Sequence, residues 1–218
     1  MAEIIVTEDG SHTLFVPELN EHYHSVHGAI QESDFIFIKS GLDYCRTNPV
    51  RIFEVGFGTG LNAFLTFINA TTQNREIEFT SIENNPLPGY LIDSLNYKDL
   101  VSREHTRIFE QLHSCGWNVR ERINKNFALL KIKADLIDYE VQGNFDLIYF
   151  DAFGPDKQPE IWSDSVFKKI SGITDRNGIL VTYSAKGSVQ RVLKKHGFEV
   201  DLLPGPPGKR QIIRAIKK

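Results

Sequence analysis

Three glycines at alternating positions form a loop whose spacing suits the binding of a nucleoside. The segment Glu54-Val55-Gly56-Phe57-Gly58-Thr59-Gly60 lies between a strand expected over 51–56 and a helix expected over 60–70. Glycine lets the backbone turn sharply and approach a ligand closely. Leu61 stands where the dinucleotide fingerprint GxGxxG has its third glycine. We therefore expect this loop to hold a cofactor through Glu54, Gly56, Gly58 and Gly60.

Acidic residues end the next two long strands. Glu83 ends a strand expected over 77–83, where a carboxylate can bind both ribose hydroxyls of a nucleoside. Asp135 follows a strand expected over 127–134 and is a candidate for reading the adenine amino group of a bound nucleoside. The alternatives are a solvated acid at a strand end for Glu83 and a helix or turn cap for Asp135.

The elements that position these residues alternate between strand and helix from residue 51 onward, which indicates βαβ units on a parallel sheet. The last two strands are separated by about seven residues, too few for a parallel crossover, so one of them is reversed. This arrangement is typical of class I S-adenosylmethionine-dependent methyltransferases, a Rossmann-like α/β fold, and differs from the nicotinamide-binding Rossmann domain. Seven strands are expected, over 51–56, 77–83, 127–134, 145–150, 178–184, 198–203 and 211–217. Helices are expected over 60–70, 159–171 and 187–196, with helical material from about 87 to 115.

Before the alternating pattern begins, residues 1–50 are expected to form a small N-terminal cap, and residues 51–218 the methyltransferase domain. Short strands are expected in this cap at 13–17 and 35–38.

The segment 151–162, DAFGPDKQPEIW, carries the most specific motif in the chain. It resembles the pattern D-[GA]-F-x-P-x-K-x-P-x-x-W of the tRNA 5-methylaminomethyl-2-thiouridine methyltransferases, the MnmC family. The resemblance extends over nearly the whole chain, through Tyr23-His24-Ser25, Glu32, the loop 54–62, Ser184-Ala185-Lys186-Gly187, Gly197-Phe198 and Gly208-Lys209-Arg210. The glycine loop with Glu54 also resembles the methyltransferase motif ExGxGxG.

This resemblance implies S-adenosyl-L-methionine as cofactor and tRNA, at its anticodon loop, as partner. The implied reaction methylates the exocyclic amine of 5-aminomethyl-(2-thio)uridine at the wobble position. Bifunctional members of the family carry a flavin-dependent oxidase domain that would follow residue 218, so a stand-alone methyltransferase is expected.

Asp151, at the end of the strand 145–150, is the candidate catalytic residue for such a transfer. An ammonium must lose a proton before it attacks a methyl group, and a carboxylate can orient the amine and accept that proton. Because an ordinary aspartate has a pKa near 3.9 and is a poor base, orientation is expected to be the larger contribution. A structural or cofactor-contact role is the alternative.

Further candidates surround this motif. Lys157 is a candidate for tRNA phosphate, or else an exposed loop lysine, and Phe153 and Trp162 are candidates for stacking on the flipped base, with a core position the favoured interpretation of Trp162. His24 and Ser25 are expected at the substrate side of the pocket. The histidines of the pattern HxHxxH, at 22, 24 and 27, superficially resemble a metal cluster, but no metal is expected because no acid or cysteine cluster accompanies them.

Charge is distributed unevenly along the chain. The formal net charge is −3, yet residues 186–218 carry an excess of seven positive charges. A local positive field attracts a polyanion, so Lys186, Lys194, Lys195, Lys209 and Arg210 are expected to contact the tRNA backbone. A solvated helix face with a lysine tail is the alternative.

Two other function classes stay open from the sequence: a catalytically silent methyltransferase-fold module that binds RNA or a partner, and an aminopropyltransferase. No apolar run is long enough to cross a membrane, and Met1-Ala2-Glu3 does not begin a secretory leader, so a cytoplasmic protein is expected. Cys45 and Cys115 are widely spaced and are expected to be ordinary reduced thiols.

Overall fold

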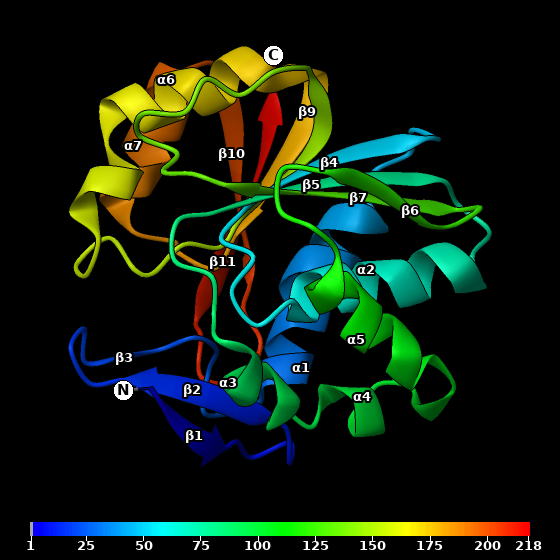
Figure 1. Cartoon of the computed structure of the whole chain (residues 1–218). Helices are drawn as coiled ribbons and strands as arrows, with labels where there is room; N and C mark the ends of the chain where they lie inside the picture. Colours follow the sequence, from blue (N-terminus) through cyan, green and yellow to red (C-terminus); the bar gives the residue numbers. More distant parts are fainter. Residues whose placement is uncertain (1) are drawn as a thin grey trace.

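The computed structural model describes residues 2–218 and is built around one twisted sheet (Figure 1). The sheet has eight strands in the order β10-β11-β9-β8-β4-β5-β7-β6. The pairs of β4 with β5 and β8, of β5 with β7 and of β8 with β9 are parallel, whereas β11 is antiparallel to both of its neighbours. The strands are β4 (Val50–Val55), β5 (Ile77–Glu83), β6 (Arg120–Asn124), β7 (Phe127–Lys133), β8 (Phe145–Phe150), β9 (Thr174–Thr182), β10 (Phe198–Pro204) and β11 (Gln211–Lys217).

Successive side chains of a strand point to opposite faces, so the sheet separates two cores. Ile52 and Tyr149 face one core, which is covered by α2 (Leu61–Thr72) and α5 (Thr106–Ser114). Phe53 and Phe150 face the other core, covered by α6 (Asp164–Ile173) and α7 (Gly187–Lys195). Strands buried on both faces are typical of a parallel sheet between two helical layers. The α/β class and the reversed strand near the C-terminus are confirmed.

The remaining helical segments join these layers and are short. Between β5 and α5 lie α3 (Gly89–Asp93), α4 (Tyr97–Leu100) and the 3-10 turn η2 (Arg103–His105), and η3 (Pro159–Trp162) precedes α6. Among residues 2–218, no helix is both long and apolar enough to span a bilayer.

The N-terminal part forms its own small sheet in the order β1-β2-β3. Its strands are β1 (Glu3–Val6), β2 (His12–Val16) and β3 (Glu21–His22), followed by α1 (Ala29–Ser33) and the π-helix η1 (Asp34–Leu42). Leu14, Ile36 and Phe37 are buried in the same core as α2. Because this core is shared, the division of the chain at residue 50 stays a prediction.

Two expectations about elements need correction. The strand expected at 35–38 is part of the π-helix η1, because a short apolar run does not distinguish a strand from a buried helix. The sheet has eight strands instead of seven, since β6 pairs antiparallel with β7 at the edge. The sequence of β6, RERIN, is polar and carries little apolar alternation, which explains why it was missed.

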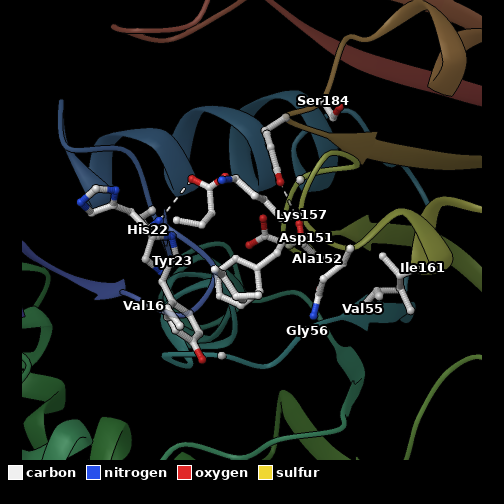
Figure 2. A pocket seen from close by; sticks show the side chains of 18 of the residues that line it. Val16, His22, Tyr23, Val55, Gly56, Asp151, Ala152, Lys157, Ile161 and Ser184 are labelled. Carbon is white, nitrogen blue, oxygen red and sulfur yellow. Dashed lines mark hydrogen bonds between the residues drawn. The ribbon is translucent and has the colours of Figure 1, made fainter. Parts of the chain in front are cut away.

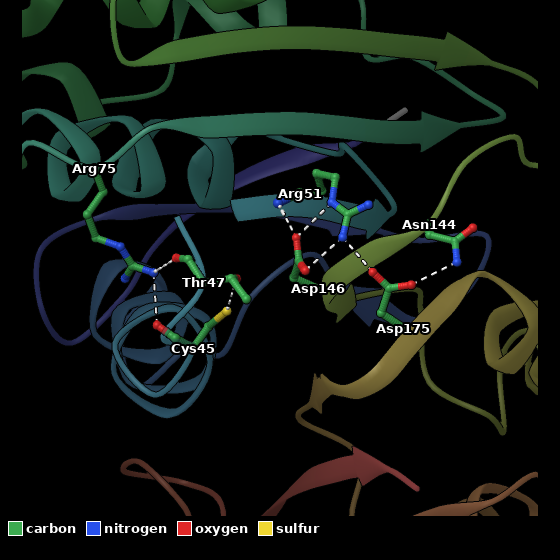
Figure 3. Close-up of polar contacts among 7 residues, drawn as sticks. All are labelled: Cys45, Thr47, Arg51, Arg75, Asn144, Asp146 and Asp175. Atoms are coloured by element: carbon green, nitrogen blue, oxygen red, sulfur yellow. Dashed lines mark hydrogen bonds and ion pairs between the residues drawn. The ribbon is translucent and has the colours of Figure 1, made fainter. Parts of the chain in front are cut away.

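An ion-pair cluster fixes the end of the sheet at which β4 and β9 begin (Figure 3). The Arg51 guanidinium donates to both carboxylate oxygens of Asp146 and to Asp175, joining β4, β8 and β9. These hydrogen bonds raise the pKa of Arg51. Asn144 adds a hydrogen bond to Asp175 at 2.8 Å. The parallel strands finish at the opposite end of the sheet, and the loops that follow them there carry the candidate site.

Candidate active site

A cavity of about 660 Å³ lies where β4, β5, β7, β8 and β9 end. This volume is typical of a small-molecule site. The glycine loop and the segment after β8 form one side, and residues of the N-terminal part such as Val16 and Tyr23 form the other (Figure 2). Ligands of open α/β sheets bind at the carboxyl ends of the strands, so this is the candidate site.

The backbone of the loop requires glycine at its first and third glycine positions. Gly56 has φ 90° and Gly60 has φ 70°, values that L side chains rarely adopt. A Cβ on Gly56 would lie 2.9 Å from the Asp151 carbonyl oxygen, and one on Gly60 would lie 2.6 Å from His113 Nε2. Gly56 therefore brings the loop against the segment that carries Asp151.

The Glu83 carboxylate is held at the end of β5. Its Oε2 accepts from the Gly58 backbone N–H at 3.1 Å, and its Oε1 accepts from the Asn85 N–H at 2.8 Å. Glu83 lines the cavity. A carboxylate fixed beside the glycine loop is well suited to the two hydroxyls of a ribose.

Asp135 also lines the cavity, and it closes a turn as well. Its Oδ1 accepts from the Ile137 N–H at 2.9 Å and its Oδ2 from Asn84 Nδ2 at 3.1 Å. The turn-capping alternative considered from the sequence is therefore present, and adenine binding by Asp135 stays a prediction.

Asp151 lies on the cavity wall directly after β8. Its Oδ2 accepts from Asn62 Nδ2 at 2.8 Å. Burial raises the pKa of Asp151 to about 7, with the Glu32 charge adding to the rise, while the Asn62 hydrogen bond and the Lys209 charge oppose it. The expectation of an ordinary, weakly basic carboxylate is therefore wrong in this environment. A carboxylate with a pKa near the operating pH is well matched to accepting a proton.

Residues 97–218 match the model of a family described as S-adenosyl-L-methionine-dependent methyltransferase. The chain belongs to this methyltransferase family. Two curated relatives, both named tRNA 5-methylaminomethyl-2-thiouridine biosynthesis bifunctional protein MnmC, are each 29% identical to it. The protein from Campylobacter hominis matches 93% of this chain and 31% of its own length, and that from Cupriavidus metallidurans 98% and 34%. The chain thus spans about a third of the length of these relatives.

Solved structures agree with the methyltransferase fold. The crystal structure of MNMC2 from Aquifex aeolicus superposes with a TM-score of 0.82 at 29% identity, covering 100% of this chain and 70% of that one. The spermidine synthase from Thermotoga maritima has a TM-score of 0.57 at 12% identity, covering 99% of this chain and 71% of that one, and shows similarity of fold alone. S-adenosyl-L-methionine is the cofactor of this methyltransferase, and the acid beside the glycine loop fits its ribose.

Two of the residues expected to hold the cofactor do not reach the cavity of the methyltransferase. Glu54 is 1% exposed and accepts a hydrogen bond from Ser81 within the sheet, because its side chain points toward α2. Gly60 begins α2 in a left-handed conformation and faces His113. Gly56 and Gly58 do line the cavity.

The basic residues expected to form one surface are distributed over different parts of the molecule. Lys157, Lys186 and Lys209 line the cavity. Arg210 is exposed outside it, and Lys194 and Lys195 lie at the far end of α7, roughly 12 Å from Lys186 at 1.5 Å per residue. Topology separates these charges because a helix that follows a parallel strand runs away from the carboxyl ends of the strands.

His24 and Ser25 line the cavity on the side formed by the N-terminal residues, and their place on the substrate side stays a prediction. His24 Nε2 is 2.8 Å from Thr59 Oγ1, and burial lowers the pKa of His24 to about 4. His24 is therefore neutral at physiological pH and supports the glycine loop. His27 pairs with Glu8 at 2.9 Å instead of approaching His24. Within residues 2–218, no group of three or more histidine, cysteine or acidic side chains is arranged to hold a metal.

The two aromatic candidates have different environments. Trp162 is 7% exposed and donates from Nε1 to the Phe153 carbonyl at 2.7 Å, so it belongs to the core, the interpretation favoured from the sequence. Phe153 lines the cavity and packs edge-on against Tyr23, with ring centroids 4.9 Å apart. Base stacking by Phe153 stays a prediction.

The cavity residues without a role assigned from the sequence include Asn62, Glu32 and Tyr183. Tyr183 directly follows β9 and donates to the Ala152 carbonyl at 2.8 Å. Its position after a parallel strand was a usable signal, since such positions face the ligand. Asn62 and Glu32 lie within helices, where only tertiary structure reveals which side chains turn toward the cavity.

Proposed function

We propose that this methyltransferase transfers the methyl group of S-adenosyl-L-methionine to the exocyclic amine of 5-aminomethyl-(2-thio)uridine at the wobble position of tRNA. The observation that carries the proposal is Asp151, a cavity carboxylate with a pKa of about 7 that lies against the glycine loop. The names of the MnmC relatives support the tRNA substrate. Such a substrate places the reaction in the cytoplasm.

When bound, the cofactor supplies an activated methyl group on sulfur. The chain has to hold an amine in line with that methyl, remove its extra proton and exclude water. Asp151 Oδ2 is occupied by Asn62, and Oδ1 is left to face the amine. The ammonium proton would pass to Asp151, which would leave the nitrogen lone pair free to take the methyl group that the bound cofactor would supply.

The tRNA approaches, in this proposal, from the side on which Lys157 and Lys186 line the cavity. Lysine ammonium groups at the rim attract phosphates. Lys186 also forms an ion pair with Asp156, which phosphate would have to replace. Phe153 provides an aromatic surface for an unstacked base. Contact with the anticodon loop follows from the wobble position of the proposed target.

Nucleoside analysis of tRNA tests this function. A strain lacking the protein should accumulate 5-aminomethyl-(2-thio)uridine, and the wild-type gene should restore the methylated nucleoside while the Asp151→Asn gene should not. The purified protein should add one methyl group to that tRNA in the presence of S-adenosyl-L-methionine, and no aminopropyl group in the presence of decarboxylated S-adenosylmethionine. An unchanged nucleoside profile in the deletion strain would contradict the proposed substrate.

A further inference from the structure

Glu54 is a buried acid that the proposed mechanism does not use. It is 1% exposed and lies in register with Ser81 on β5 and Tyr149 on β8. Its Oε2 accepts from the Ser81 hydroxyl at 2.6 Å, and its Oε1 makes no hydrogen bond with any residue of 2–218. An ionised carboxylate needs several donors or a cation when it is buried, and Glu54 has neither.

Asn62 connects this buried acid to the candidate base. It is 4% exposed in the first turn of α2, and its Nδ2 donates to Asp151 Oδ2 at 2.8 Å. Burial raises the pKa of Glu54 well above its usual range, and the charges of Asp151 and Glu83 add to the rise. The Ser81 hydrogen bond and the nearby Asn62 amide oppose this rise. One uncharged amide therefore stands between two carboxyl groups.

We propose that Glu54 is protonated in the folded protein and that Asn62, packed between the two carboxyl groups, fixes one oxygen of Asp151 so that the other faces the substrate amine. Asn62 and Glu54 are then positioning residues for the proposed transfer, and this inference rests on the proposed role of Asp151. Asn62 and protonated Glu54 together form a neutral bridge to Asp151. Because this bridge carries no charge, it orients Asp151 without placing a second negative charge beside it.

Other titratable groups around Asp151 come from different elements, and the protonation state of Glu54 does not change their charges. Glu32 of α1 and Lys209 of the turn between β10 and β11 act on it in opposite directions, and the Tyr183 phenol and Glu21 lie on the same cavity. An ionised Glu54 would add a further negative charge next to Asp151. The titration of Asp151 therefore reports the protonation state of Glu54.

Carboxyl carbon NMR of the whole chain tests this bridge without requiring activity. Asp151→Asn and Glu54→Gln assign the two resonances in protein carrying 13C-labelled Asp and Glu. The Glu54 resonance is expected at the protonated position at neutral pH. The pH at which Asp151 is half protonated, followed by its carboxyl resonance, is its titration midpoint. Glu54→Gln is neutral like a protonated glutamate, so it should leave the Asp151 midpoint within about 0.3 pH units of its wild-type value. A Glu54 resonance at the ionised position, or a fall of about one unit in the Asp151 midpoint, would overturn the proposal.

Asn62→Leu tests the positioning role. Losing the donor should raise the Asp151 midpoint by about one unit and lower kcat by about tenfold or more, with KM for tRNA little changed. Asn69→Leu is the matched control, because Asn69 lies on the same helix and donates instead to Asp43 at 3.1 Å. Asn62→Ser provides the same test should the leucine variant not fold. An Asp151 midpoint that does not move in either Asn62 variant refutes the bridge. If the midpoints behave as expected but the wild-type protein does not methylate tRNA, the proposed function fails and the bridge stands.

Discussion

Lys209 Nζ lies 3.1 Å from Glu32 Oε1 and 4.6 Å from the centroid of the Tyr183 ring. This ion pair joins the turn between β10 and β11 to α1 at the cavity. Only 26% of the Lys209 side chain is exposed. Its charge therefore acts on Asp151 and Glu32, and a phosphate contact by Lys209 would compete with Glu32.

Removing the Glu83 carboxylate should weaken cofactor binding. Losing charge-assisted hydrogen bonds to ribose costs roughly 1.5 to 3 kcal/mol, or about a 10- to 150-fold rise in the Kd for S-adenosylhomocysteine. Calorimetry on Glu83→Ala measures this Kd. Glu78→Ala is the control, since Glu78 lies on the same strand and pairs with Arg120 on the edge strand β6. Equal affinities for wild type and Glu83→Ala would remove the ribose assignment.

The methylation rate should depend on pH through Asp151. Its pKa is raised to about 7, so the carboxylate becomes protonated as the pH falls through that value and can no longer accept a proton. The rate should therefore decline on the acid side, by about tenfold per unit once the pH is well below the pKa. Single-turnover rates on tRNA bearing 5-aminomethyluridine measure this profile.

Asp151→Asn should lower that rate by roughly 10²- to 10⁴-fold, the usual contribution of a general base. Its affinity for S-adenosylhomocysteine should stay within about threefold of wild type, because the carboxylate is assigned to the amine. A variant within a few-fold of the wild-type rate would exclude Asp151 from the mechanism.

Lysines that line the cavity should differ in their effect on RNA binding from lysines at the far end of α7. Replacing Lys157 and Lys186, which line the cavity, by alanine should weaken tRNA binding and make the slope of log K against log salt shallower by about 0.7 to 0.9 per lost contact. Replacing Lys194 and Lys195 removes the same charge from the far end of the helix and should change neither quantity. Filter binding over a salt series measures both, with Arg210→Ala tested separately. If the two double variants weaken binding equally, general charge and not the cavity rim governs docking.

Gly60→Ala should destabilise the fold. Alanine at φ 70° costs roughly 1 to 2 kcal/mol, and its Cβ would displace His113, whose Nε2 lies 3.1 Å from the Thr59 carbonyl oxygen. Urea unfolding measures the loss. Gly172→Ala, inside α6 with open space around it, should be neutral or stabilising by about 0.5 to 1 kcal/mol. Equal midpoints for Gly60→Ala and wild type would show that the left-handed turn is not required.

Much of the sheet could be predicted because its signals are local. Apolar runs such as 145–150 and the glycine loop after Val55 fix strand, turn and helix within a few residues. The short link between 203 and 211 determines the antiparallel pair by its length alone. The run 35–38 was misassigned and β6 was missed, because neither a buried helical turn nor a polar edge strand leaves a distinctive periodicity.

The sequence by itself determined the order of the elements, the glycine loop and the strand-end positions of Glu83, Asp135 and Asp151. Topology places such positions together at the carboxyl ends of the parallel strands. Only the tertiary structure decided what surrounds them. It buried Glu54, separated Lys194 from Lys186, and brought Asn62, Glu32 and Lys209 together around Asp151. Those neighbours are distant in the chain, and a pKa depends on burial and on charges within a few ångströms, which no local pattern of residues encodes.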